Sequence, residues 1–301
     1  MKREELLQVY DHHYADTYNE RFLTNRFSQL GTDFELQALR KVIGPGTRWL
    51  DIGCGTGFFL SQFPAVERAG LDINPVMLQR ARAANPNALF FREGDFRNPF
   101  PEWRSAWSLI SCMWTPYNYV ESLPEVERVV QNMVDWTVAG GAIFIPVVDI
   151  EDLRPNTLVP YEEKADIYGG SILLTSYTWE WVEHSGAVHR NLIAPHADHF
   201  IRLLQPYFDQ VELLRYPPFQ NGWVSRKAVL ATGRRAIADA QRPAQVIRHP
   251  IPPPANDSLP DTPPLASATA SLSNRALLAE VVGRIRTGRF WRALRKKMVR
   301  R

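Results

Sequence analysis

The sequence predicts an α/β fold built on a doubly wound, mostly parallel sheet of seven strands. Apolar runs of strand length alternate with amphipathic helical stretches between about residues 48 and 149. The first run ends in a glycine-rich turn, Gly53 to Gly57, which leads directly into a helical pattern. Strands that alternate with helices in this way are joined by right-handed crossovers, so they lie parallel in one sheet.

The segment before the first strand is expected to be helical. Apolar residues recur at helical spacing through residues 4–43, and the turn sequence of residues 44–46 (Gly-Pro-Gly) stops the pattern. Residues 1–46 are therefore predicted to form an N-terminal helical cap. The sheet-forming domain is predicted to span residues 47–234.

The elements of the sheet-forming domain follow in order. Strands are expected near residues 48–52, 67–72, 88–92, 107–113 and 142–149, and helices near 57–63, 75–84 and 123–139. A further helix is expected near residues 195–207, and two strands near 209–216 and 224–232 complete the sheet. Between the fifth strand and this helix, a β-hairpin insertion is expected at residues 170–194. Loops at the carboxyl ends of such strands carry recognition, so the insertion is a natural place for substrate specificity.

The glycine turn indicates the class of ligand. Gly53, Gly55 and Gly57 follow Asp51 as D-x-G-x-G-x-G, whereas a dinucleotide fingerprint spaces its glycines G-x-G-x-x-G. Asp51 would repel a pyrophosphate but attract a cation, and S-adenosylmethionine carries an ammonium and a sulfonium without any phosphate. Asp72 ends the next predicted strand, a position from which a carboxylate can accept from both ribose hydroxyls.

This pattern resembles the class I S-adenosylmethionine-dependent methyltransferases over about residues 10–233. The resemblance implies a Rossmann-like fold with a final antiparallel pair of strands, and S-adenosylmethionine as the cofactor. It also implies that Asp95 holds the adenine amino group and that Phe96 covers the ring. The cofactor-binding residues expected are thus Asp51, Gly53, Gly55, Gly57, Asp72, Ile73, Asp95, Phe96 and Met113.

A closer resemblance concerns the acceptor side of the site. The Y-D-x-x-Y opening at residues 10–14 and the run Met113, Trp114 and Tyr119 are similar to the N-methyltransferases of nucleotide-linked amino sugars. The resemblance implies that Tyr14 lies over the reaction centre. Pro116 and Asn118 stand where that group usually has small residues, so the resemblance does not decide that the acceptor is an amine. The aromatic side chains could equally pack in the core.

A hydroxyl or carboxyl acceptor would need a general base, unlike an amine with an exposed lone pair. Histidine is the usual base at neutral pH, and His196 is the leading candidate, ahead of His189 and His199. His196 follows a proline, so it could instead support a helix start. The catalytic residues expected are Tyr14, Tyr119 and His196.

Composition limits the remaining possibilities. The two cysteines, Cys54 and Cys112, form neither a disulfide framework nor a CxxC metal site, so no metal is expected. The N-terminus resembles no signal peptide, and no apolar stretch is long enough to span a bilayer. The protein is therefore expected to be cytoplasmic.

Charge is unevenly distributed along the chain. Residues 273–301 contain ten basic residues and one acid, a charge of +9, so that residues 1–272 carry −6 of the total of +3. An acidic body argues against nucleic acid as the substrate. Residues 235–272 are predicted to be a proline-rich linker and residues 273–301 a basic amphipathic helical tail. This tail could be disordered, could contact the inner face of a membrane peripherally, or could contact nucleic acid.

The expected function is methyl transfer from S-adenosylmethionine to an amine or hydroxyl of a small polar acceptor, most of all a sugar or glycan precursor. One alternative is methylation of another natural product, such as a polyketide or peptide. Another is a non-catalytic cofactor-binding scaffold whose tail recruits a membrane or partner. The oligomeric state is not predicted.

Overall fold

The computed structural model describes residues 3–24, 28–148, 166–167, 170–171, 176–182, 188–217 and 227–253. The chain divides into two units, residues 1–255 and 256–301, and every described residue belongs to the first. The predicted basic tail and half of the predicted linker therefore lie outside the described residues. Among the described helices, none has the length and apolar character needed to cross a bilayer.

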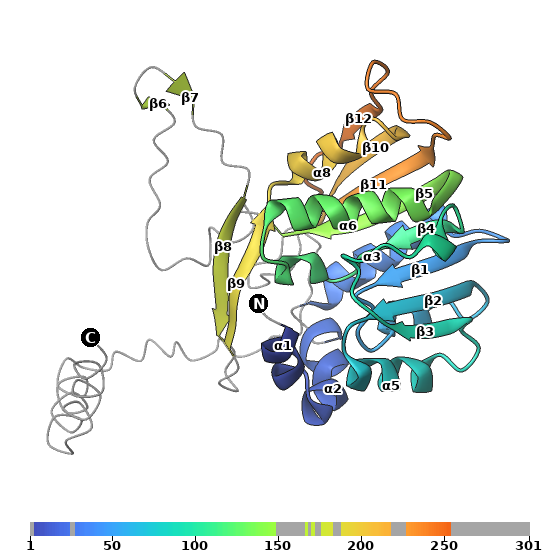
Figure 1. Cartoon of the computed structure of the whole chain (residues 1–301), viewed down its shortest axis with the longest axis vertical. Helices are drawn as coiled ribbons and strands as arrows, with labels where there is room; N and C mark the ends of the chain where they lie inside the picture. The colour runs from blue at the N-terminus through green and yellow to red at the C-terminus, as the bar shows by residue number, and fades with distance from the viewer. Residues whose placement is uncertain are drawn as a thin grey trace, which may run out of the picture. The chain divides into compact units, whose positions relative to one another are not determined.

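The core of the first unit is an eight-stranded sheet in the order β12-β10-β11-β5-β4-β1-β2-β3 (Figure 1). Its parallel half consists of β1 (Arg48–Ile52), β2 (Glu67–Asp72), β3 (Phe90–Glu93), β4 (Trp107–Ser111) and β5 (Thr137–Val147). The predicted α/β fold with a mostly parallel sheet is confirmed. β5 begins at Thr137 rather than near residue 142. The preceding helix ends at Trp136, so the strand already includes the glycine pair at residues 140–141.

The other half of the sheet contains β10 (Phe208–Arg215), β11 (Lys227–Arg234) and β12 (Gln245–Arg248). β11 runs antiparallel to both β5 and β10, which confirms the expected antiparallel pair. β12 pairs parallel with β10 and makes an eighth strand, so the prediction of seven strands is wrong by one. β12 has only four residues and lies between Pro243 and Pro250. A run this short, flanked by prolines, is too brief to show the alternation that predicts a strand.

Helices cover both faces of the sheet, as a doubly wound fold requires (Figure 1). They are α1 (Arg3–Val9), α2 (His12–Tyr18), the π-helix η1 (Asn19–Leu23), α3 (Gln29–Val42), α4 (Phe58–Ser61), α5 (Pro75–Ala84), the 3-10 helices η2 (Pro101–Trp103) and η3 (Pro116–Tyr119), α6 (Leu123–Trp136) and α8 (Ala197–Leu204). The helices expected within residues 4–43 are therefore present.

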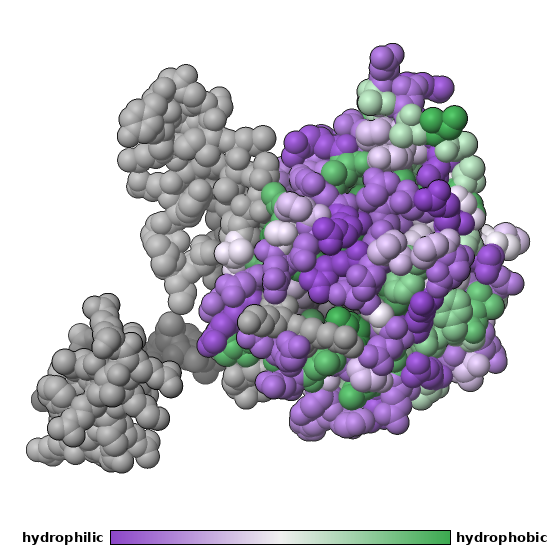
Figure 2. All heavy atoms as spheres, viewed as in Figure 1, coloured by the Kyte–Doolittle hydropathy of each residue, from purple (hydrophilic) through white to green (hydrophobic). Residues whose placement is uncertain are grey.

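Two hydrophobic clusters lie on opposite faces of the sheet. Alternating residues of β1 show this division, because Leu50 and Ile52 pack in the cluster with α6 and α8, whereas Trp49 packs with α3, α4 and α5. The described surface in Figure 2 is correspondingly dominated by hydrophilic residues. A parallel sheet buried on both faces leaves its carboxyl ends as the natural place for a ligand.

A separate β-hairpin stands beside these carboxyl ends (Figure 1). It pairs β8 (Ser176–Val182) antiparallel with β9 (Val188–Pro195), as the sequence predicts for the insertion. Two shorter strands, β6 (Asp166–Ile167) and β7 (Gly170–Ser171), pair with each other before it. The hairpin contributes Trp179 and Leu192 to the pocket described next.

Candidate active site

A pocket opens at the carboxyl ends of the parallel strands. Its wall combines the loops that follow β1, β2, β3 and β4 with the N-terminal helices and the β8–β9 hairpin. Among the predicted site residues, those that line it are Tyr14, Gly53, Gly55, Asp72, Ile73, Asp95, Phe96, Met113 and Tyr119. Three predicted residues do not line the pocket: Asp51, Gly57 and His196.

The glycine turn gives the pocket a backbone wall. Gly53 and Gly55 adopt φ values of +65° and +51°, a region that favours glycine. A Cβ on Gly53 would lie 2.4 Å from Cγ of Pro116, so the turn and the loop after β4 approach closely there. Gly57 has another role. It precedes α4, and a Cβ on it would lie 2.8 Å from Nδ2 of Asn85, so this glycine serves packing against the end of α5.

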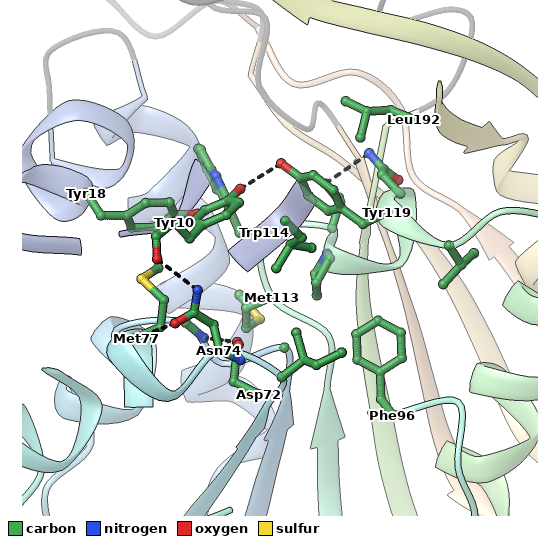
Figure 3. A pocket seen from close by; sticks show the side chains of 18 of the residues that line it. Tyr10, Tyr18, Asp72, Asn74, Met77, Phe96, Met113, Trp114, Tyr119 and Leu192 are labelled. Carbon is green, nitrogen blue, oxygen red and sulfur yellow. Dashed lines mark hydrogen bonds between the residues drawn. The ribbon is translucent and has the colours of Figure 1, made fainter. Parts of the chain in front are cut away.

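Asp72 joins the glycine turn to the loop after β2. Its Oδ2 accepts from the backbone N–H of Gly55 at 2.8 Å, and its Oδ1 accepts from the N–H of Asn74 at 2.9 Å (Figure 3). The carboxylate is 8% exposed, and this burial raises its pKa. Asp72 therefore presents a fixed acceptor to the pocket, as the role predicted for it requires.

Asp51 lies beneath the pocket and is only 1% exposed. Its Oδ1 accepts from Oγ of Ser111 at 2.6 Å and from the N–H of Met113 at 3.2 Å. Burial, aided by the negative charge of Asp72, raises the pKa of Asp51 to about 7, despite these two hydrogen bonds. Asp51 thus acts on the pocket through its charge and through Met113, which lines the pocket, rather than by direct contact.

The raised pKa of Asp51 leads to a testable effect on stability. A carboxyl whose pKa is higher in the folded than in the unfolded protein lowers stability at pH values where it must ionise. Asp51→Asn keeps an oxygen for Ser111 and Met113, so we expect it to raise the free energy of unfolding above pH 7, by up to a few kcal/mol at about 1.4 kcal/mol per pKa unit. The gain should shrink from pH 7 toward pH 4 and vanish below it.

Urea unfolding of wild type and variant at pH 4, 6 and 8 measures this gain. Asp33→Asn, which removes an exposed carboxylate from α3, controls for the loss of one negative charge. A gain of the same size at pH 4 and pH 8 would show that burial of the Asp51 charge is not its cause.

The N-terminal helices form an aromatic wall of the pocket. Leu6, Tyr10, Tyr14, Tyr18 and Phe22 line it at four-residue spacing, which places them on one face of the helical segment. Tyr14 is 6% exposed, and its ring centroid lies 4.7 Å from that of Tyr10. Sequence reasoning singled out Tyr14 but missed Tyr18 and Phe22, although the same spacing could have indicated them.

Two hydrogen bonds attach this aromatic wall to the loops of the cofactor side. Nδ2 of Asn74 donates to the backbone oxygen of Tyr10 at 2.9 Å (Figure 3), and Oγ1 of Thr56 donates to Oδ1 of Asn19 at 2.6 Å. Asn74 also caps α5, since its Oδ1 accepts from the N–H of Val76 at 2.8 Å. These hydrogen bonds therefore fix the position of the N-terminal aromatic wall relative to the loops after β1 and β2.

A row of polar groups runs from the aromatic wall to the hairpin. The hydroxyl oxygens of Tyr10 and Tyr119 are 2.7 Å apart and point toward one another in Figure 3. The Tyr119 hydroxyl also lies 3.0 Å from Nδ1 of His189, a buried residue of β9. Burial raises the pKa of Tyr10 well above its usual value.

The three candidate histidines lie in different places. Nδ1 of His196 accepts from the N–H of Asp198 at 3.2 Å, so His196 caps α8 and lies away from the pocket wall. Nε2 of His199 lies 3.4 Å from a carboxylate oxygen of Glu127, also outside the wall. His189 is the one of the three candidates that the structure brings against a pocket residue. The prediction of His196 as the leading base is therefore not supported by its position.

The residues present fit S-adenosylmethionine. Asp72 lines the pocket beside Gly53 and Gly55, and Asp51 lies just below it, whereas the charge of Asp95 is matched by Arg97. Such a site favours a ligand with positive charges and no phosphate. The positive φ of the two glycines also leaves their backbone open to close approach by a ligand.

Comparison with known proteins agrees with this arrangement. Residues 50–141 match the family described as a methyltransferase domain. Over 77 residues the chain is 40% identical to trans-aconitate 2-methyltransferase of Escherichia coli O1:K1 / APEC. The matched stretch covers 23% of this chain and 29% of that enzyme. The chain thus spans less than a third of the length of this curated relative.

Solved structures extend the likeness in fold. The structure of Streptomyces venezuelae DesVI matches with a TM-score of 0.50 at 20% identity, over 73% of this chain and 98% of that one. The complex of DhpI with SAH matches with a TM-score of 0.50 at 13% identity, over 78% and 98%. Residues 50–141 thus match a methyltransferase domain, and the described chain has the fold of these solved structures. The resemblance to S-adenosylmethionine-dependent methyltransferases that the glycine turn and Asp72 predict is therefore confirmed.

Proposed function

We propose that the protein transfers a methyl group from S-adenosylmethionine to a hydroxyl or amine of a small polar acceptor, with a sugar or glycan precursor as the favoured class. The row from Tyr10 through Tyr119 to His189 carries this proposal. Tyr10 and Tyr119 line the pocket with Met113 and Trp114, and their hydroxyls lie away from Asp72 in Figure 3. A polar acceptor can therefore form hydrogen bonds where the methyl group is to be received.

The aromatic wall supports a small acceptor. Tyr10, Tyr14, Tyr18 and Phe22 line the pocket, together with Trp179 and Leu192 of the hairpin. Flat rings of this kind offer large apolar faces, which suit contact with the apolar face of a sugar. The match of Met113, Trp114 and Tyr119 to the amino-sugar methyltransferases points to the same class of acceptor.

S-adenosylmethionine supplies a methyl group on a positively charged sulfur that needs no further activation. The protein's main contribution is then alignment and exclusion of water, worth up to about 7 to 11 kcal/mol when the geometry is good. The hydrogen bonds from Asn74 to Tyr10 and from Thr56 to Asn19 provide that alignment, because they join the acceptor wall to the cofactor loops.

A hydroxyl acceptor must also lose its proton. The oxygen of Tyr119 can accept that proton while the tyrosine passes its own to Nδ1 of His189, 3.0 Å away. The Tyr119–His189 pair therefore serves a hydroxyl acceptor in particular. An amine acceptor would use the same groups only to hold and orient it.

Incubation of the purified chain with methyl-labelled S-adenosylmethionine and a panel of nucleotide sugars tests the proposal. Amino and hydroxyl sugars, simple phenols, and trans-aconitate as a carboxylate acceptor should be compared, with product masses determined. A mass gain of one methyl group on a sugar is the expected result. Transfer to trans-aconitate alone would reject the sugar, and no transfer with intact cofactor binding would favour the scaffold alternative.

A further inference from the structure

Arg97 lines the pocket beside Asp95 and Phe96, the two residues expected at the adenine end. Its Nε lies 3.0 Å from both carboxylate oxygens of Asp95, and its Nη2 lies 2.6 Å from Oδ2. The backbone N–H of Arg97 adds a bond of 2.9 Å to Oδ1. An arginine that holds both oxygens of a carboxylate fixes the plane in which that carboxylate lies.

A second carboxylate anchors the guanidinium from the other side. Nη1 of Arg97 donates to Oε1 of Glu125, in the first turn of α6, at 3.1 Å. Oε2 of Glu125 in turn accepts from the N–H of Glu121 at 2.7 Å. The side chain of Arg97 is 29% exposed, so this ion pair is less screened than one on the open surface. Arg97 therefore connects the loop after β3 to α6.

The backbone of the same loop is fixed independently of Arg97. Nδ2 of Asn132, also on α6, donates to the carbonyl oxygen of Phe96 at 2.9 Å. The N–H of Asn98 donates to the carbonyl oxygen of Asp95 at 3.0 Å, which closes a turn. The loop can therefore keep its path without the guanidinium, and the special task left to Arg97 is the orientation of the Asp95 carboxylate.

We propose that Arg97 is a positioning residue for adenine: it holds the Asp95 carboxylate in a fixed plane, so that the site selects a purine with a 6-amino group over one with a 6-oxo group. The inference rests on the proposed use of S-adenosylmethionine. A fixed carboxylate accepts from an amino group and repels a carbonyl oxygen. A carboxylate free to rotate would discriminate less, because it could turn away from the carbonyl.

Calorimetric titration with S-adenosylhomocysteine and S-inosylhomocysteine tests this inference without turnover. Wild type should bind the adenosyl compound at least about tenfold more tightly, the effect of one hydrogen bond to a charged group. Arg97→Gln should reduce the preference to less than about threefold. Arg97→Lys should fall between the two, because an ammonium cannot hold both carboxylate oxygens in one plane.

Arg92→Gln is the matched control. Arg92 is in the same stretch of chain and pairs with Glu102, but it does not line the pocket, so its removal should leave the preference unchanged. Equal weakening of both ligands by Arg97→Gln, with the preference retained, would assign Arg97 to loop stability and overturn the inference. Failure of wild type to bind S-adenosylhomocysteine would instead overturn the proposed function. Thermal unfolding of each variant verifies the fold.

Discussion

Asp72→Ala is expected to weaken the binding of S-adenosylhomocysteine by at least about a hundredfold while the protein remains folded. Hydrogen bonds to a charged group contribute about 1.5 to 3 kcal/mol each, and Asp72 is placed to accept from both ribose hydroxyls. The variant also frees the N–H groups of Gly55 and Asn74, which Asp72 now fixes at 2.8 and 2.9 Å. The glycine turn should then lose part of its order, which weakens binding further.

Isothermal titration measures this loss, and thermal unfolding shows whether the fold survives. Glu67→Ala is the control, since Glu67 lies at the opposite end of the same strand, where it forms an exposed ion pair with Arg48. The control should bind as wild type does. An Asp72→Ala protein that binds within about threefold of wild type would remove Asp72 from the cofactor site.

The cofactor side could be predicted from sequence because its determinants are local. Gly53 and Gly55 follow directly on β1, and Asp72 ends β2, so the spacing along the chain fixes their positions relative to the sheet. The same reasoning did not show that Asp51 bonds to Ser111 and Met113 beneath the pocket. Ser111 ends the neighbouring strand β4 and Met113 follows it. The sequence pattern does not show that these residues lie against the side chain of Asp51.

The acceptor side depends on contacts between distant segments. His189 reaches Tyr119 only because the β8–β9 hairpin folds back beside the loop after β4, and Tyr10 reaches the same hydroxyl from the N-terminal helices. Nothing in the local sequence around His189 distinguishes it from His196, which precedes a helix and has the better-known role of a cap. The pairing of Arg97 with Asp95 is local, by contrast, and the sequence Asp-Phe-Arg could have indicated it.

Substitutions on the cofactor side and on the acceptor side of the pocket should change different quantities. Changes at Asp72 act on cofactor affinity, which can be measured without an acceptor. Changes at Tyr119 or His189 should act on the transfer step, because the hydroxyl of Tyr119 bonds to Tyr10 and to His189 on the acceptor side of the pocket. Affinity and turnover can therefore be separated by experiment.

Tyr119→Phe and His189→Gln are each expected to lower kcat by about a hundredfold with a hydroxyl acceptor, near the lower end of what a general base contributes. The dissociation constant of S-adenosylhomocysteine should change by less than about threefold. Phenylalanine keeps the ring but removes the hydroxyl that lies 2.7 Å from Tyr10 and 3.0 Å from His189. Glutamine retains hydrogen-bonding capacity at position 189 but has no basic nitrogen.

His196→Ala separates this prediction from the one made on sequence alone. The variant should lose about 1 kcal/mol of stability, the usual effect of removing a helix cap, and keep its turnover. kcat is measured with the acceptor that the panel identifies. Wild-type turnover in both Tyr119→Phe and His189→Gln would assign these side chains to packing, and a large loss in His196→Ala would restore His196 as the base.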